Sequence, residues 1–302
     1  MQLAYYPGCS LQQSSALYDV QSRRIFSELG TELAEIDDWN CCGATSAGKV
    51  DDFMAVAMPA RNIGIAERDG FSEMVIPCSA CYSRTIVAQR RIEDDGGLKD
   101  AINSELSAPI GGGLKVSSIL EALEARIAGA LKDRVVHKLT GLRPVCYYGC
   151  MLTRFPYDVP VPDDVENPQG MERVLGALNI KTIDWNHKTA CCGASASVND
   201  IDTAHNLMAH ILKEALARGA NCFVTTCPMC QMNLEAYQGK IAKRYGDASA
   251  ATILYLPQLL GMAFGLSDEV LGLDLNLAID DQFRRKRKDA IFLHAEENVQ
   301  TA

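Results

Sequence analysis

The sequence contains Asp38-Trp39-Asn40-Cys41-Cys42-Gly43, and the same pattern returns as Asp184-Trp185-Asn186 followed, after four further residues, by Cys191-Cys192-Gly193. A single cysteine in an aromatic and glycine-rich setting precedes each pair, and a Cys-x-x-Cys motif follows it. The upstream cysteines are Cys9 and Cys150, and the downstream ones are Cys78, Cys81, Cys227 and Cys230. Ten of the twelve cysteines thus belong to two copies of one frame, and we expect the rest of the chain to be the scaffold of two thiolate sites.

The two frames indicate an internal duplication. The offset between the copies is 141 residues at the lone cysteine, 150 at the cysteine pair and 149 at the Cys-x-x-Cys motif, and residues 187–190 account for part of the change. Cysteine order, the Asp-Trp-Asn triplet and the glycine after each pair agree in both copies. We therefore predict two similar halves related by a pseudo-twofold axis, with domains at residues 1–140 and 141–302, the second carrying the basic tail segment 284–288.

Composition is typical of a globular protein with a core of normal size. Of the 302 residues, 48% are hydrophobic and 22% are charged. The formal net charge is 29 − 38 = −9. A nucleic acid partner is therefore disfavoured, because binding to phosphates requires a basic surface.

Neither a signal peptide nor a membrane-spanning segment is expected. The first residues, Met1–Ala4, lack a basic and apolar leader pattern and run into a strand-like segment. The apolar run near 252–266 is interrupted and shorter than the roughly 20 residues that span a bilayer. We expect a cytoplasmic protein without membrane insertion, in which twelve cysteines indicate metal or redox chemistry rather than structural disulfides.

The hydrophobic pattern alternates between short strands and amphipathic helices. The predicted strands are residues 3–6, 31–36, 73–77, 143–148, 180–183, 222–226 and 253–256. The predicted helices are residues 11–29, 53–68, 82–92, 120–131, 171–178, 203–218 and 259–264. Glycine and proline clusters predict loops at 94–97, 111–113 and 156–168. This order favours an α/β fold of two Rossmann-like halves, each with a parallel sheet covered by helices.

In both halves, cysteines come after the ends of predicted strands. Cys9 and Cys78 follow strands of the first half, and Cys150 and Cys227 follow strands of the second. Open parallel sheets bind ligands at the carboxyl ends of their strands. We therefore expect each thiolate site at one edge of its own sheet.

Each frame supplies five thiolates, one more than a four-cysteine zinc site or an ordinary cubane cluster uses. The surplus indicates a bridging thiolate or an unusual cluster. Gly43 and Gly193 have no Cβ and would let the backbone after each pair approach a bulky inorganic core. Two zinc sites of four cysteines each with spare thiols, or a disulfide within an adjacent pair, are the less favoured alternatives.

Three further residues have less specific signals. Cys146 and Cys222 lie outside the frames and are expected to be small buried residues, although Cys146, four residues before Cys150, is placed to face the second site. His187 is expected to be a solvated loop residue or, as the alternative, to protonate a departing thiolate.

These features resemble the B subunits of heterodisulfide reductases, a family with two cysteine-rich CCG domains. The family pattern is one cysteine, then Cys-Cys-Gly, then Cys-x-x-Cys. The intervening segments here are 31 and 35 residues long in the first copy and 40 and 34 in the second, whose first segment is longer than usual. The similarity includes residues 147–154, 164–168, 191–195, 227–234 and 258–261, and it extends to about residue 275.

The resemblance implies one noncubane 4Fe-4S cluster in each half, held by five cysteines. The first cluster would use Cys9, Cys41, Cys42, Cys78 and Cys81, and the second Cys150, Cys191, Cys192, Cys227 and Cys230. It also implies a catalytic role in which a disulfide is cleaved or formed between the two clusters. Electrons would pass from an iron–sulfur protein like the C subunits of heterodisulfide reductases, and ultimately from a flavoprotein like their A subunits.

The cysteine spacing leaves the substrate open. In a methanogen it would be the coenzyme M–coenzyme B heterodisulfide, and in a bacterial complex another disulfide or a sulfur carrier, including one that is oxidised. Two other classes of function remain as alternatives: an electron-relay CCG subunit of a larger dehydrogenase, and a zinc-stabilised interaction module. Two complete cysteine frames favour substrate chemistry over a relay.

Overall fold

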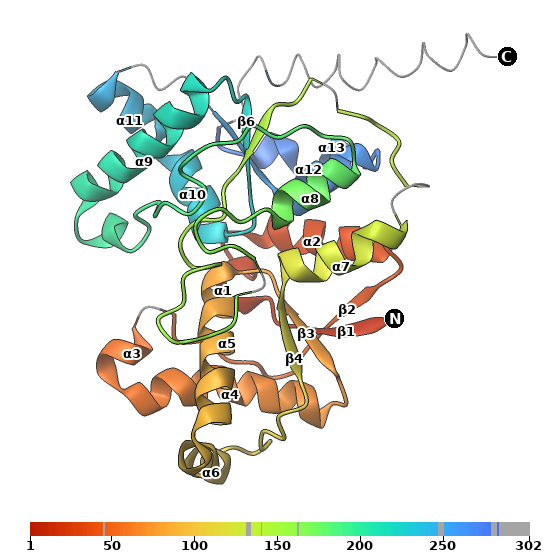
Figure 1. Ribbon diagram of the computed structural model, residues 1–302, viewed down its shortest axis with the longest axis vertical. Coiled ribbons are helices and arrows are strands. Elements are labelled where there is room, and N and C mark those ends of the chain that lie inside the picture. Colours follow the sequence, from red (N-terminus) through yellow and green to blue (C-terminus); the bar gives the residue numbers. More distant parts are fainter. Residues whose placement is uncertain are drawn as a thin grey trace, which may run out of the picture. The chain divides into compact units, whose positions relative to one another are not determined.

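The computed structural model describes residues 1–44, 46–130, 134–139, 141–161, 163–246, 251–278 and Phe283. Helices alternate with parallel strands along the chain, which confirms the predicted α/β class (Figure 1). In this part of the chain, no helix is both long and apolar enough to cross a membrane. The basic segment 284–288 lies outside the described residues.

The chain divides into two compact units. The first contains residues 1–123 and 151–163, and the second contains residues 124–150 and 164–302. Segment 151–163 follows the predicted boundary at residue 140, yet it packs with the first unit. Phe155 meets Tyr82 edge-on with ring centroids 5.9 Å apart, and the Tyr157 hydroxyl donates to Asp94 over 3.3 Å. The boundary itself and the pseudo-twofold axis stay predictions.

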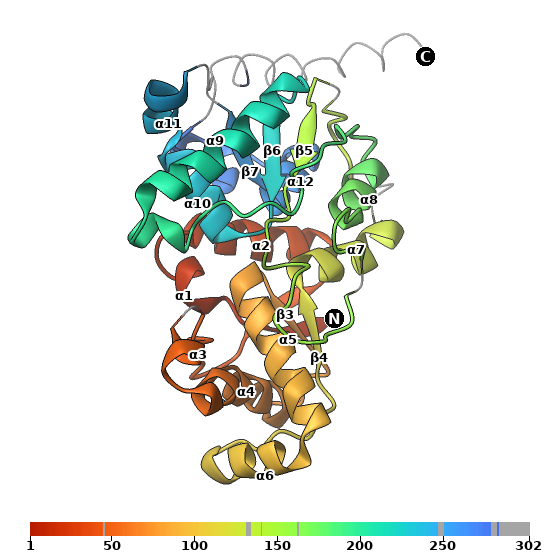
Figure 2. The same cartoon turned by 60° about the vertical axis from the view of Figure 1, so that its left-hand side comes forward.

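The first unit is built on a four-stranded parallel sheet with the order β2-β1-β3-β4. Its strands are β1 (Gln2–Tyr5), β2 (Glu32–Glu35), β3 (Glu73–Ile76) and β4 (Lys115–Ser118). The register pairs Leu3 with Leu33, so that both apolar side chains join the buried core. Helix α2 (Ala16–Glu28) packs on β2, and α5 (Ser79–Asp94) packs on β3, β4 and α4 (Asp52–Arg68) (Figure 2).

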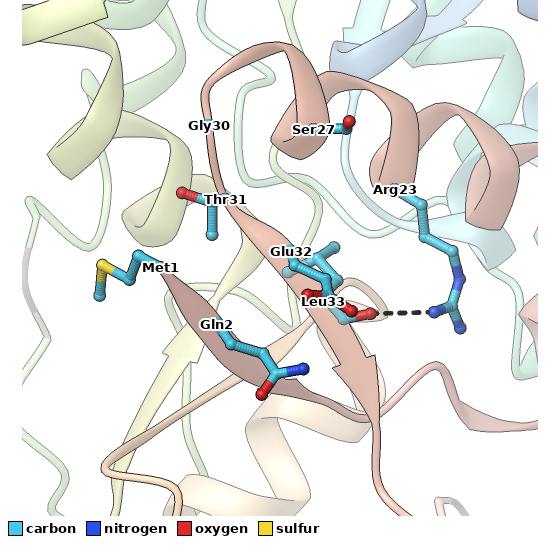
Figure 3. A pocket seen from close by; sticks show the side chains of 8 residues that line it. All are labelled: Met1, Gln2, Arg23, Ser27, Gly30, Thr31, Glu32 and Leu33. Carbon is cyan, nitrogen blue, oxygen red and sulfur yellow. Dashed lines mark hydrogen bonds between the residues drawn. The ribbon is translucent and has the colours of Figure 1, made fainter.

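Arg23 of α2 covers the free edge of β2 (Figure 3). Its guanidinium donates to the Leu33 carbonyl over 3.1 Å and pairs with Glu35 over 2.6 Å. Occupying an edge carbonyl in this way discourages another strand from pairing there. A cavity of about 600 Å³ lies beside Arg23, at the amino ends of β1 and β2, so it is at the edge of the sheet opposite to the cysteines.

The second unit contains a three-stranded parallel sheet with the order β5-β6-β7. Its strands are β5 (Pro144–Cys146), β6 (Cys222–Thr225) and β7 (Thr252–Tyr255). Helix α12 (Leu256–Ala263) packs on β6 and β7, and α10 (Pro228–Ala236) packs on β7 and α9 (Ile201–Ala217). The aromatic centre of the core is Tyr147, Trp185 and Phe223.

The predicted strand at 180–183 is wrong, because the second sheet ends at β5. Ile183 donates one backbone bond to the Pro144 carbonyl, over 2.8 Å. Pro144 has no N–H to offer in return, and the Cys146 carbonyl accepts the Trp185 indole N–H at 2.9 Å. A further strand would therefore lack the Pro144 N–H and would find the Cys146 carbonyl already used.

Other differences from the predicted elements have local causes. The predicted helix at 11–29 is interrupted, because the Ser15 amide turns back to the Ser10 carbonyl, which separates α1 (Gly8–Leu11) from α2. The loop predicted at 94–97 contains the start of α6 (Gly96–Glu105), since the Asp95 side chain caps it by accepting from the Leu98 amide at 3.0 Å. The remaining helices are α3 (Ala47–Val50), α7 (Ile119–Ala130), α8 (Gly170–Ala177), α11 (Gln238–Tyr245), α13 (Asp268–Leu271) and two short 3-10 turns at Ala196–Val198 and Leu273–Leu275.

The internal duplication is visible in matching caps. Asp51 caps α4 by accepting from the Met54 amide over 3.0 Å, and Asp200 caps α9 by accepting from the Thr203 amide over 3.1 Å. Both caps lie shortly after a Cys-Cys-Gly sequence. Gly70 and Gly219 then follow the two helices with φ values of 82° and 81°. The two halves therefore share local structure as well as cysteines.

The glycine loop 111–113 is held by a single carboxylate. Glu67 accepts from the amides of Gly111, Gly112, Gly113 and Leu114 over 2.6, 2.9, 2.7 and 3.0 Å. This loop leads directly into β4. The carboxylate thus satisfies four backbone donors that enter the sheet.

Replacing Glu67 should loosen the entry to β4. We expect Glu67→Ala to lower the free energy of unfolding by about 1–3 kcal/mol, because charge-assisted hydrogen bonds to four amides are lost. Glu105→Ala, at an exposed helix end, is the matched control and should change it little. Equal denaturation midpoints for both variants would contradict this role.

Candidate functional site

Each Cys-x-x-Cys motif lies at the start of a helix that follows a strand. Cys78 is the N-cap residue of α5, and Cys227 is the N-cap residue of α10. Cys81 and Cys230 lie in the first turns of the same helices. A helix N-terminus carries partial positive charge and free amides, so both motifs lie where the backbone attracts negative charge.

The second cysteine of each pair lies against the Cys-x-x-Cys motif. The Sγ atoms of Cys42 and Cys81 are 3.4 Å apart, and those of Cys192 and Cys230 are 3.5 Å apart. All four residues are buried. The same contact therefore forms twice, between segments that are 38 or 39 residues apart in the chain.

The loop that carries the lone cysteine also reaches this motif. A Cβ added to Gly8 would lie 2.8 Å from the Cys81 Sγ, and one added to Gly149 would lie 2.9 Å from the Cys230 Sγ. Their φ values are +72° and +66°, in the left-handed region that favours glycine. The Gly-Cys sequence thus brings Cys9 and Cys150 to the other thiols of their frames.

A buried tyrosine links the lone-cysteine loop to the cysteine pair in each unit. The Tyr6 hydroxyl donates to the Asn40 carbonyl over 3.0 Å, and the Tyr147 hydroxyl donates to the Ala190 carbonyl over 2.6 Å. Burial and, second, the nearby cysteine thiolates raise the pKa of both tyrosines, so each remains a protonated donor. The sequence prediction took these tyrosines only as aromatic context, although both stand three residues before the lone cysteine.

The glycines after the pairs permit a sharp turn. Gly43 and Gly193 have φ values of +77° and +74°. An added Cβ would lie 2.6 Å from the Ala47 Cβ or 2.8 Å from the Ala204 Cα. Glycine is therefore required here by the neighbouring helix, and the predicted approach of this backbone to a cofactor stays a prediction.

Contacts between the cysteine pair and the Cys-x-x-Cys motif shift the pKa values of the thiols in the same direction in both units. Hydrogen bonds with Cys41 and then Cys81 lower the pKa of Cys42, and a hydrogen bond with Cys230 lowers the pKa of Cys192. The same contacts raise the pKa of Cys81 and of Cys230. The second cysteine of each pair thus has a lowered pKa in both units, which favours its thiolate form.

Contacts to the remaining frame cysteines differ between the units. In the second unit, a hydrogen bond with Cys150 lowers the pKa of Cys191 and raises that of Cys150. In the first, the pKa of Cys41 is raised by its hydrogen bond with Cys42, by burial and, more weakly, by the charge of Cys9. Among the described residues, no three His, Cys, Asp or Glu side chains are arranged to hold a single metal ion.

Each thiol set has a buried side and a solvent-facing side. Cys9, Cys41 and Cys191 are exposed and Cys150 is partly exposed. The buried members are Cys42, Cys78, Cys81, Cys192, Cys227 and Cys230. A ligand held by such a set is anchored from inside and remains accessible from outside.

The three residues with weaker sequence signals are buried or packed against an aromatic ring. Cys146 and Cys222 are fully buried strand residues, and burial raises the pKa of Cys222 to about 12. The His187 ring stacks on Trp185 with centroids 6.1 Å apart. His187 is therefore a partly packed residue rather than a fully solvated one.

Known proteins are similar to this chain in sequence and in fold. The family described as the CCG cysteine-rich domain matches residues 3–84 and 145–235. The 8-methylmenaquinol:fumarate reductase membrane anchor subunit of Wolinella succinogenes is 32% identical over 279 residues, which cover 91% of this chain and 96% of the relative. The B subunit of the ferredoxin/F(420)H(2)-dependent CoB-CoM heterodisulfide reductase of Methanosarcina acetivorans is 25% identical over 290 residues, covering 94% and 96%.

A solved structure supports the fold alone. A hypothetical protein from Helicobacter pylori superposes with a TM-score of 0.75 at 12% sequence identity. The match covers 93% of this chain and 52% of that protein, so the chain spans about half the length of that structure.

Gly8 offers a test of the close packing around Cys81. We expect Gly8→Ala to reduce bound metal at the first site, because its Cβ displaces a thiol, and to destabilise the fold. Gly30→Ala is the control: its φ is +71°, but an added Cβ meets nothing within 4 Å, so only about 1 kcal/mol of backbone strain is expected. Metal content and unfolding midpoints that match between the two variants would show that the sulfur contact is unimportant.

Proposed function

The chain belongs to the cysteine-rich CCG domain family, together with B subunits of heterodisulfide reductases, and from this we propose that it is the disulfide-handling subunit of a heterodisulfide reductase-like complex. Each unit would hold one noncubane 4Fe-4S cluster. The ligands would be Cys9, Cys41, Cys42, Cys78 and Cys81 in the first unit, and Cys150, Cys191, Cys192, Cys227 and Cys230 in the second.

One observation supports this proposal: in both units the second cysteine of the pair and the lone-cysteine loop meet the Cys-x-x-Cys motif through matching contacts. The pair reaches the Cys-x-x-Cys motif at 3.4 or 3.5 Å, and a glycine brings the lone-cysteine loop against the same sulfur. Thiolates are the ligands that iron–sulfur clusters prefer. The donor set therefore fits such a cofactor, and its five members exceed what zinc uses.

When bound, an iron–sulfur cluster supplies one-electron redox chemistry and iron atoms that bind sulfur. The chain's own residues supply position and electrostatics. Helix N-termini carry the Cys-x-x-Cys motifs, and the buried tyrosines fix the loop before each pair. The exposed thiol side, at Cys9, Cys41 and Cys191, is the side open to a sulfur substrate.

Reducing a disulfide takes two electrons and two protons and yields two thiols. Each cysteine frame would hold a one-electron carrier, so we propose that the two sites share the task. Electrons would come from an iron–sulfur protein similar to the C subunits of heterodisulfide reductases, and ultimately from a flavoprotein similar to their A subunits. The cytoplasm is the proposed location, and the disulfide or sulfur carrier stays open.

A second candidate function is electron relay within a larger enzyme. The specific observation in its favour is the 32% identity to a subunit whose name places it in an 8-methylmenaquinol:fumarate reductase. In that case the chain would pass electrons between partner subunits without binding a disulfide. The same relative is named a membrane anchor, so a membrane-bound partner belongs to this alternative.

Loss of one ligand from either unit should separate these functions. We expect Cys42→Ser and Cys192→Ser each to abolish disulfide-dependent oxidation of a reduced viologen dye, measured with the iron–sulfur partner protein present. Both residues are buried and both contact the Cys-x-x-Cys motif. Each variant should keep its circular dichroism spectrum, while its iron content falls.

Cys222→Ala is the matched control, because this cysteine is buried in β6 outside both frames. It should retain iron and activity. If a variant that has lost one cluster still reduced disulfides at the wild-type rate, a disulfide handled by both clusters would be excluded and the relay would be preferred.

Metal analysis of anaerobically purified protein tests the cofactor directly. Two 4Fe-4S clusters predict about eight iron and eight sulfide per chain, whereas two four-cysteine zinc sites predict about two zinc. A zinc-only result would support the interaction module instead.

A further inference from the structure

The second cysteine site contains a loop that the first lacks. In the first half, Asn40 is followed directly by Cys41, whereas residues 187–190 stand between Asn186 and Cys191. These residues form a turn, and its central member Lys188 is only 2% exposed. Burying an unpaired lysine would cost folding free energy, so the partners of Lys188 decide what this turn does.

The Lys188 backbone is bonded to the loop that carries Cys150. Its carbonyl accepts from the Tyr148 amide over 2.9 Å and from the Gly149 amide over 3.1 Å. At the end of the same turn, the Ala190 carbonyl accepts from the Tyr147 hydroxyl. The inserted turn thus joins the segment before Cys150 to the segment before Cys191.

The Lys188 side chain fixes this turn from behind. Its ammonium lies 2.8 Å from Glu172 of α8, donates to the Pro168 carbonyl over 3.3 Å and lies 3.5 Å from Asp184. Glu172 also accepts from the Tyr148 hydroxyl, which in turn accepts from the Met171 amide. The pair is therefore part of a connected buried network.

Among the described residues of the first half, this arrangement has no counterpart. Pro7 stands where the second half has Tyr148, so the equivalent backbone has no N–H to donate. There the Asn40 amide and carbonyl bond directly with the Asn62 side chain, over 3.0 and 2.8 Å. The two thiol sets are alike, but their supports are built differently.

We infer that Lys188 is a positioning residue of the second cysteine site: its carbonyl holds the amides before Cys150, while its ammonium, paired with Glu172, keeps that carbonyl in place. This inference rests on the proposed function, because the readout is the cluster at that site. Lys188 contacts Tyr148, Gly149, Pro168, Glu172 and Asp184. It therefore acts on the site through the segments that carry Cys150 and Cys191.

The test compares three Lys188 variants in the full chain, purified anaerobically. Lys188→Met should lose the second cluster, with iron and sulfide per chain falling by about half and the first cluster's paramagnetic resonance signal unchanged. Lys188→Arg keeps the cation and should retain at least part of the second signal. Lys243→Met, at an exposed position on α11, is the control and should bind iron like the wild type.

The third Lys188 variant combines Lys188→Met with Glu172→Gln and covers the case in which Lys188→Met alone fails to fold. Removing one partner of a buried ion pair leaves the other charge unpaired, whereas neutralising both removes that cost. Lys188→Met with Glu172→Gln retains an acceptor for Tyr148, so it should fold and bind the first cluster, with the second lost or spectrally altered. A folded double variant with both clusters and unchanged spectra would overturn the inference.

The wild-type protein separates this inference from the proposed function. If the wild type bound no iron–sulfur cluster, the proposed function would fail and the inference with it. If it bound two and every Lys188 variant did the same with unaltered spectra, the inference alone would fail.

Discussion

The close approach of a glycine to a cysteine sulfur is the constraint on which both sites depend. Gly8 and Gly149 stand where an added Cβ would lie under 3 Å from Cys81 or Cys230. Such an approach requires the loop after one strand and the helix after another to leave the sheet side by side. The sheets provide this, because β1 pairs with β3 and β5 pairs with β6, all in parallel. The close contact between the glycine and the sulfur therefore depends on the order of the strands in each sheet.

The two halves share this constraint but differ in the segments that support the thiols. The first sheet continues past β1 to β2, whose free edge is covered by Arg23. The second sheet stops at β5, where the Trp185 indole N–H donates to the Cys146 carbonyl. Between Asn186 and Cys191, a turn that contains the buried Lys188 replaces the direct Asn-Cys sequence of the first half. The two thiol sets thus share the contact between the cysteine pair and the Cys-x-x-Cys motif, but they lie in unequal surroundings.

The sequence was sufficient for most of the fold and for the grouping of the thiols. Period-two and helical patterns located all the strands except β4, and cysteine spacing grouped ten thiols into two sets. The Lys115–Ser118 stretch was missed because it contains one strongly apolar residue and becomes a strand by pairing with β3. The error at 180–183 arose from Pro144 and Trp185, whose effect on the sheet edge depends on tertiary contacts. The roles of Tyr6, Tyr147 and Lys188 likewise depend on distances that spacing does not encode.

The packing of segment 151–163 with the first unit has a consequence for biosynthesis. A chain leaves the ribosome amino end first, and domains generally fold as units in that order. The first unit, however, includes Phe155, which packs against Tyr82 and emerges only after β5 and Cys150. Completion of the first unit must wait for a strand of the second to be translated. In this duplicated chain the first unit is therefore complete only after part of the second has been synthesised.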